Sequence, residues 1–143
     1  VLAISRDAEI RAFAEHHLAT EEIHLGFFEG WLTSRQKSLL LPLWRVSGFI
    51  LGAVSAVGGC NWVYASIEAV ESFVVKHYES QYAALDAYGD ETLRAAIHRF
   101  CNDEVDHRDE AAGEAYARSG LLQAWCWVVG FGSEQAVKIA RRI

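Results

Sequence analysis

The sequence has a single proline, three cysteines and no methionine among its 143 residues. Because one proline and few runs of β-branched residues leave little to oppose helices, we expect an all-α chain. The cysteines Cys60, Cys101 and Cys126 are odd in number and widely spaced, so they form neither a zinc pattern nor a disulfide framework. We interpret them as buried thiols in a reducing compartment.

Positive charge is also scarce, since 13 Lys and Arg oppose 19 Asp and Glu for a net charge of −6. A general nucleic-acid binder needs a basic face, so nucleic acid is excluded as a partner. The first residues show no basic region followed by a short apolar run, so we expect no signal peptide. What the chain has in quantity is apolar surface: 52% of its residues are hydrophobic, and five are Trp. Its length suits one domain, residues 1–143, with a real core.

Helical periodicity and capping residues divide the chain into helices. His16 and His17 are interpreted as surface or boundary histidines, and His98 as a surface histidine. The expected order is a helix from its N-cap Asp7 to about Ser34, with Leu18 and Leu25 among its apolar positions; a polar linker over 34–38; a second helix that Pro42 opens; a third from about Asn61 to Ala87; a fourth capped by Asp90, its segment ending at Gly120; and a last one from about Leu121.

One stretch, residues 46–67, carries no charge and is long enough to span a bilayer. Gly58 and Gly59 interrupt it, and neither half reaches the roughly 20 residues that a span needs. We predict a helix that packs in the bundle and dips into the membrane interface, with Phe49 and Trp62 among its anchors. A buried core helix remains the alternative. The basic tail at Lys138–Ile143 is either an anionic-lipid contact or a favourable helix end.

Two Glu-x-x-His pairs stand out, Glu21 with His24 and Glu104 with His107. On a helix, residues three apart share a face, so each pair directs one carboxylate and one imidazole to the same point. Glu71 adds a third carboxylate on an otherwise apolar helix, where it costs several kcal/mol unless it is paired or bound to metal. Two such pairs, with one further Glu for each, form the di-iron site of ferritin-like bundles.

Five of the six expected ligands are therefore visible, and the sixth is a lone Glu. Glu9 and Glu15 lie roughly 18 and 9 Å from Glu21 along the helix axis, too far to serve. We expect the natural protein to carry about 25 to 40 further N-terminal residues with a Glu that faces the site. Glu68, one turn before Glu71, is the rival ligand.

At these residues the chain resembles the demethoxyubiquinone hydroxylases, the di-iron monooxygenases of ubiquinone biosynthesis, though without their first ligand-bearing helix. The resemblance rests on four stretches and runs from about Ser5 to the end. It is specific, because Pro-Leu-Trp and His-Tyr-x-x-Gln are not required by di-iron chemistry in general. The matching stretches are residues 41–49, 69–71, 77–81 and 103–107.

The resemblance implies a ferritin-like helical bundle with additional membrane-interface helices. It implies that Glu21, His24, Glu71, Glu104 and His107 bind two Fe ions, and that His77 and Tyr78 lie close to the metal and serve electron transfer. The implied reaction puts one atom of O2 on the quinone ring. The implied partners are an isoprenoid quinone, a membrane surface, other ubiquinone-biosynthesis proteins and a second copy of the chain.

The implied location is the cytoplasmic face of a bacterial inner membrane or the matrix face of the mitochondrial one. Two other functions stay open. A ferritin-like peroxidase or ferroxidase would use the same ligands without an apolar mouth. A membrane-associated helical bundle without catalysis would bind no iron.

Overall fold

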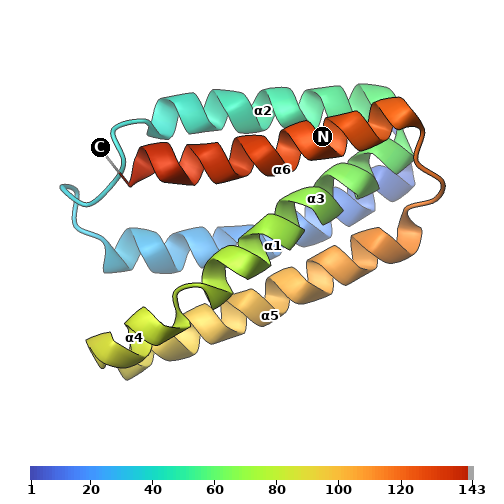
Figure 1. Ribbon diagram of the computed structural model, residues 1–143. Coiled ribbons are helices and arrows are strands. Elements are labelled where there is room, and N and C mark those ends of the chain that lie inside the picture. The colour runs from blue at the N-terminus through green and yellow to red at the C-terminus, as the bar shows by residue number, and fades with distance from the viewer. Residues whose placement is uncertain (142–143) are drawn as a thin grey trace. The chain divides into compact units, whose positions relative to one another are not determined.

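The computed structural model describes residues 1–141, so Arg142 and Ile143 of the basic tail lie outside the described residues. The described residues contain helices and no strand, which confirms the all-α class and is consistent with a ferritin-like helical bundle (Figure 1). Two compact units are present, Val1–Val63 with the residues from Glu134 on, and Tyr64–Ser133. The helices are α1 (Ala8–Trp31), α2 (Leu41–Gly58), α3 (Cys60–Glu79), α4 (Tyr82–Tyr88), α5 (Glu91–Glu114) and α6 (Gly120–Ala140).

In the first unit, α1 begins as the sequence predicts. The Oδ1 atom of Asp7 accepts hydrogen bonds from the backbone N–H groups of Glu9 and Ile10, at 2.9 and 3.1 Å. These two bonds satisfy N–H groups that the first turn of a helix leaves without partners. Leu18 and Leu25, two of the apolar positions that recur at helical spacing, are 46% and 55% exposed.

The joint between α2 and α3 falls at the predicted glycine pair. Gly59 has φ +88°, a backbone conformation that side chains disfavour. Gly58 is needed for space, because a Cβ at this position would overlap the side chain of Trp62 and lie only 2.7 Å from its Cβ. Among the described helices, α2 alone is long and apolar enough to cross a membrane, judged by length and composition. The end of α2 at Gly58 confirms the predicted interruption of the uncharged run. The expectation that neither half of the run is long enough for a span is wrong for α2.

In the second unit, the helix expected to continue to Ala87 ends at Glu79, which corrects the prediction. The hydroxyl of Ser80 and the amide of Gln81 both donate to the carbonyl of His77, at 2.7 and 3.3 Å. Such side chains compete with the helix for its own carbonyl groups. The short α4 follows and ends at Gly89, whose φ of +76° makes it a left-handed C-cap.

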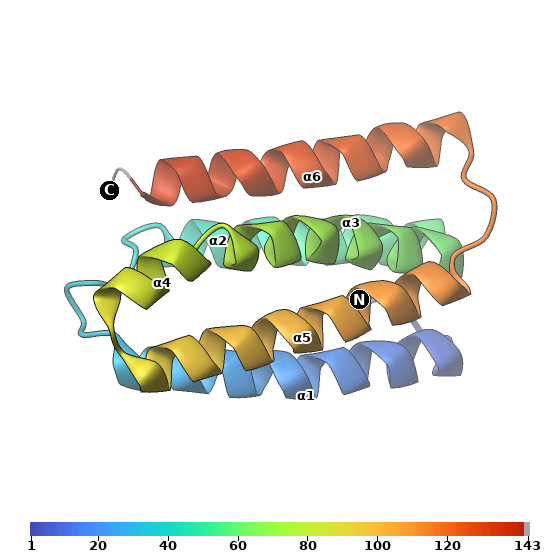
Figure 2. The ribbon, with the colours of Figure 1, turned by 60° about the horizontal axis from the view of Figure 1, so that its bottom comes forward.

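The α3–α4 segment runs opposite to α5, as Figure 1 shows, and α5 turns back so that its first turns lie beside α4 (Figure 2). Two contacts fix this register. The rings of Tyr82 and His98 stack with centroids 4.1 Å apart, and Sγ of Cys101 lies 4.0 Å from the carbonyl oxygen of Val75. The core of this unit contains Phe100, which is fully buried. This register decides which side chains of α3 and α5 stand at the same level.

Candidate metal centre

The best-formed carboxylate–histidine pair lies on α5. Glu104 and His107 are 2% and 4% exposed, and Oε2 of Glu104 lies 3.4 Å from Nδ1 of His107. Asp106, on the same helix, faces solvent. The helix therefore buries one Glu-x-x-His face and leaves acidic side chains in water on another. This is the arrangement that the spacing predicts.

The second pair lies on α1. His24 is 4% exposed, while the side chain of Glu21 is 47% exposed. Nδ1 of His24 lies 3.8 Å from Oε2 of Glu21. The spacing therefore directs both groups to one side of the helix, and this pair is more open than the one on α5.

Glu71 is the buried carboxylate of α3, at 7% exposure. Its level follows from the contact between Val75 and Cys101. From that contact, Glu71 is four residues back along α3 and Glu104 is three residues forward along α5. Because the two helices run in opposite directions, the shifts of about 6 and 4.5 Å are in the same direction. Glu71 and Glu104 thus stand at matching levels of the second unit.

The donor atoms fit a metal ion. A separation of 3.4 or 3.8 Å is too long for a good hydrogen bond but suits two atoms that each lie about 2.1 Å from one ion. Buried carboxylates and imidazoles are ligands that iron accepts, and a buried carboxylate needs a positive charge nearby. By donor chemistry the residues of both pairs and Glu71 fit an iron ion, and all of them except Glu21 are buried.

His77 and Tyr78 lie near the end of α3, both half-buried. The His77 ring stacks on Phe73, with centroids 5.8 Å apart and planes 11° from parallel. Its backbone carbonyl accepts the two bonds that end the helix. His77 is therefore held at a fixed point, six residues or about 9 Å along the axis from Glu71.

Glu68, the rival ligand, has a partner elsewhere. Its carboxylate forms an ion pair with the guanidinium of Arg118, in the segment between α5 and α6. Sequence reasoning missed Arg118, because nothing local links residues 50 positions apart. The available signal in the sequence was that Arg118 is a lone cation beside the acidic end of α5.

Two histidines differ from expectation. His17 is buried, at 6% exposure, and its ring lies against Phe13 with centroids 4.1 Å apart, so the surface interpretation is wrong for it. His98 is half-buried and stacks on Tyr82 rather than standing free. Burial, followed by a hydrogen bond with the Cys101 thiol, raises the pKa of Tyr82 to about 12. Both histidines thus have packing roles.

The thiols are less uniform than predicted. Cys101 is buried, whereas Cys60 and Cys126 are half-buried, and all three are free. Burial raises the pKa of the Cys126 thiol; the nearby Arg118 opposes the rise and Glu68 adds to it. Cys126 is therefore within electrostatic reach of the Arg118–Glu68 pair.

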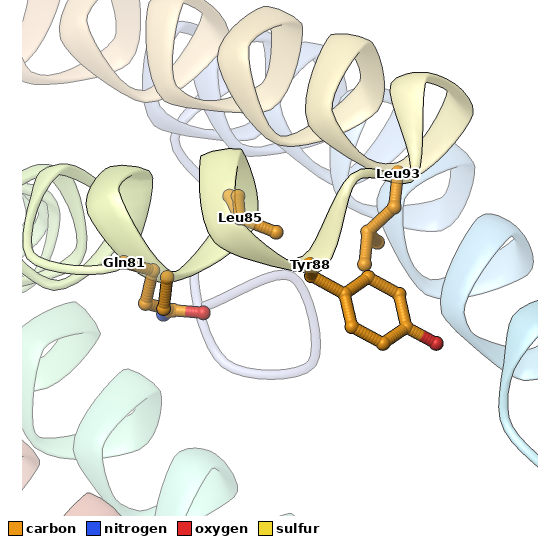
Figure 3. Close-up of a pocket in the computed structure, with 5 residues that line it drawn as sticks. Gln81, Leu85, Tyr88 and Leu93 are labelled. Carbon is orange, nitrogen blue, oxygen red and sulfur yellow. The ribbon is translucent and has the colours of Figure 1, made fainter.

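An open pocket of about 280 Å³ lies in the second unit, at the hairpin of α4 and α5. Figure 3 shows Tyr88 and Leu93 side by side at one end and Gln81 at the other. The lining offers one hydroxyl and one amide but neither carboxylate nor imidazole. It therefore lacks the ligands that would hold an iron ion. Its lining residues are Gln81, Ala84, Leu85, Tyr88 and Leu93.

An all-α chain with two carboxylate–histidine pairs is typical of proteins that bind metal between helices. Comparison with known proteins is more specific. Residues 1–140 match the family described as ubiquinone biosynthesis protein COQ7. The chain belongs to this family.

Curated relatives agree with the match. The chain is 33% identical over 132 residues to the 3-demethoxyubiquinol 3-hydroxylase of Rhodospirillum rubrum, covering 90% of this chain and 61% of that protein. It is 34% identical over 127 residues to the mitochondrial NADPH-dependent 3-demethoxyubiquinone 3-hydroxylase of Homo sapiens, covering 80% of this chain and 58% of that protein. The chain thus spans about three fifths of the length of these two relatives.

Proposed function

We propose that this chain carries the metal-binding part of a di-iron monooxygenase that hydroxylates the ring of demethoxyubiquinone in ubiquinone biosynthesis. The observation that carries the proposal is the match of residues 1–140 to a ubiquinone-biosynthesis family, over a stretch that contains both Glu-x-x-His pairs. Neither half of this observation would suffice, since Glu-x-x-His pairs also occur in other helical metalloproteins.

The ligands proposed are Glu21, His24, Glu71, Glu104 and His107, which would together hold two iron ions. Iron bound by these residues would supply the reduction of dioxygen that puts one oxygen atom on the quinone ring and releases the other as water. The chain's own contribution is a set of acidic groups that offset the charge of the ions. Burial of Glu71, Glu104 and His107 keeps their donor atoms out of bulk water and strengthens that electrostatic interaction.

His77 and Tyr78 are proposed to assist electron transfer to the centre. Their support is the stacked, fixed position of His77 at the end of α3, on the helix that carries Glu71. The electrons would come from a nicotinamide donor such as the one named for the Homo sapiens relative. Because the chain lacks a glycine-rich nucleotide motif, such a donor would act without a dinucleotide-binding domain in this segment.

The substrate carries a long isoprenoid tail, and a membrane surface is the place where such a tail resides. We propose that α2 and the first half of α6 lie against that surface. Large apolar side chains are exposed on α2, among them Phe49 at 60% and Val57 at 80%. On α6, Trp127 stacks on Phe131 at 5.2 Å, and both are exposed. Exposed apolar surface of this kind marks a membrane or protein contact.

The proposed location is the face of the bacterial inner membrane or of the mitochondrial inner membrane where ubiquinone is made. Several relatives, including that of Homo sapiens, are named mitochondrial. Other proteins of the same pathway and a second copy of the chain are proposed as partners on that surface.

Co-sedimentation with liposomes tests the membrane contact. We expect the natural chain to sediment with vesicles of neutral lipid and the double variant Phe49→Ser/Trp127→Ser to remain in solution. A matched control replaces two exposed tyrosines on other elements, in Tyr88→Ser/Tyr116→Ser. Equal sedimentation of all three proteins would contradict the contact.

Isotope labelling tests the reaction. The iron-loaded chain is incubated with a short-tailed demethoxyubiquinone, a nicotinamide donor and ¹⁸O₂, and the product is analysed by mass spectrometry. We expect one labelled oxygen atom on the ring, and none with Glu104→Gln. Turnover of hydrogen peroxide without hydroxylation would instead support the ferritin-like peroxidase, and failure to bind iron would support the non-catalytic bundle.

A further inference from the structure

The second unit holds a carboxylate that the proposed centre does not use. Glu68 lies three positions before Glu71 on α3, about 4.5 Å along the axis and 60° around it. A flexible Glu side chain spans that distance easily. Nevertheless, its carboxylate pairs with the guanidinium of Arg118, and the two side chains are 26% and 30% exposed.

Arg118 is held in place from several directions. The side-chain amide of Gln123 donates to the carbonyl of Arg118 at 3.1 Å. The indole N–H of Trp125 donates to the hydroxyl of Ser66 at 2.8 Å, which ties the first turns of α6 to α3 close to Glu68. The guanidinium thus comes from a segment that is fixed against the same part of α3, and its position does not depend on the long side chain alone.

The charge of the pair matters for any ion bound near Glu71. A free carboxylate beside a divalent ion would bind it, because a half-buried negative charge gains most from the nearest cation. An added carboxylate would alter the coordination number and lower the net charge of the site. A fixed guanidinium satisfies Glu68 with a bidentate-capable, permanently charged partner instead.

We propose that Arg118 is a positioning residue that holds Glu68 outside the metal centre, so that α3 supplies Glu71 as its only ligand. This inference rests on the proposed metal centre. It predicts that Glu68 has no direct part in metal binding while Arg118 is present and becomes a ligand when Arg118 is removed.

Titration of the complete chain with Co²⁺ under nitrogen tests this directly, because the visible absorption of Co²⁺ reports its coordination. In Arg118→Gln we expect an altered spectrum and affinity tighter by about tenfold, a change of the size that outer-shell partners cause. The double variant Arg118→Gln/Glu68→Gln should return to the natural spectrum. Arg118→Lys, which keeps a cation, should do so in part.

Two controls separate positioning from loosened packing. Trp125→Phe removes the hydrogen bond between α6 and α3 but leaves Arg118 and Glu68, so its Co²⁺ spectrum should match that of the natural chain. Glu68→Gln alone should bind as many Co²⁺ ions as the natural chain, with the same spectrum. Circular dichroism verifies that each variant is folded.

The outcomes distinguish this inference from the proposed function. Fewer Co²⁺ ions bound by Glu68→Gln alone would make Glu68 a ligand and overturn the inference, as would an unchanged spectrum in Arg118→Gln. Both results would leave the metal centre standing. If the natural chain bound no Co²⁺ at all and Glu71→Gln behaved identically, the metal centre itself would be overturned and this inference with it.

Discussion

Replacing Glu104 by Gln should separate the stability of the chain from its binding of metal. The side chain is 2% exposed, and Gln keeps its shape while removing its charge. Because a buried charge carries a desolvation cost that an isosteric neutral group does not, we expect the metal-free variant to be as stable as the natural chain or up to about 3 kcal/mol more stable. For a chain of this size that corresponds to a rise in Tm of up to roughly 10 °C.

Metal should have the opposite effect. At a hundredfold excess over its Kd, a metal ion that binds only the folded natural chain stabilises it by about 2.7 kcal/mol. Glu104→Gln loses a ligand, so most of this gain should disappear. The Tm advantage of the Glu104→Gln variant over the natural chain should therefore shrink or reverse when metal is added.

Thermal unfolding followed by circular dichroism, with and without Fe²⁺ under nitrogen, measures both effects. The matched control is Asp106→Asn, the same chemical change on the same helix at an exposed position. The control should keep the full metal-dependent rise in Tm. A Glu104→Gln variant that retained that rise, or a metal-free variant several degrees less stable than the natural chain, would refute the assignment of Glu104 as a buried ligand.

Two further predictions concern the joint of α2 and α3 and the chemistry of Cys126. Gly58→Ala should destabilise the chain by about 1–3 kcal/mol in denaturant unfolding, because the new Cβ would overlap the side chain of Trp62, whereas Gly48→Ala on the same helix meets nothing within 4 Å and should be neutral or slightly stabilising. Equal effects of the two would contradict the close approach. The pKa of Cys126 is raised by burial, so near pH 8.5 iodoacetamide should label Cys126 more slowly in the folded chain than in the unfolded chain. The difference between the two labelling rates should shrink as the pH rises through the pKa of the folded chain. Mass spectrometry of the peptide that carries Cys126 measures this rate, and labelling as fast as in the unfolded chain would count against the shift. Because folding raises the pKa of Cys126, the neutral thiol contributes its full stability at pH values below the pKa of the unfolded chain. This contribution is lost as the pH rises through the pKa of the folded chain.

The features that could be predicted from sequence are those with local causes. Asp7 and Asp90 cap helices because their side chains reach backbone N–H groups two or three residues away. Pro42 lies in the first turn of α2, and Gly59 ends that helix, each through its own backbone preference. The Glu-x-x-His faces follow from helix geometry alone.

The features that were missed depend on contacts distant in sequence or on competition between two local structures. The break at Ser80 and Gln81 has no Gly or Pro to announce it, and it arises because both side chains bond to the carbonyl of His77. The sequence could not show which of His16 and His17 is buried. Adjacent residues lie on different faces of a helix, and the apolar pattern did not indicate which of the two faces inward. Arg118 reaches Glu68 across 50 residues, which no periodicity encodes.

What distinguishes a quinone hydroxylase from a ferroxidase on this chain is its surface, because the same carboxylates and imidazoles would serve either reaction. A ferroxidase takes an aqueous ion as its substrate and gains nothing from apolar side chains in water. Here Phe49, Val57 and Trp127 are each at least 60% exposed. Exposed apolar side chains on two long helices lower solubility unless a membrane or a partner covers them. The proposed substrate, with its isoprenoid tail, would supply the reason to keep them, since the proposed hydroxylase would have to reach that substrate where the tail is buried.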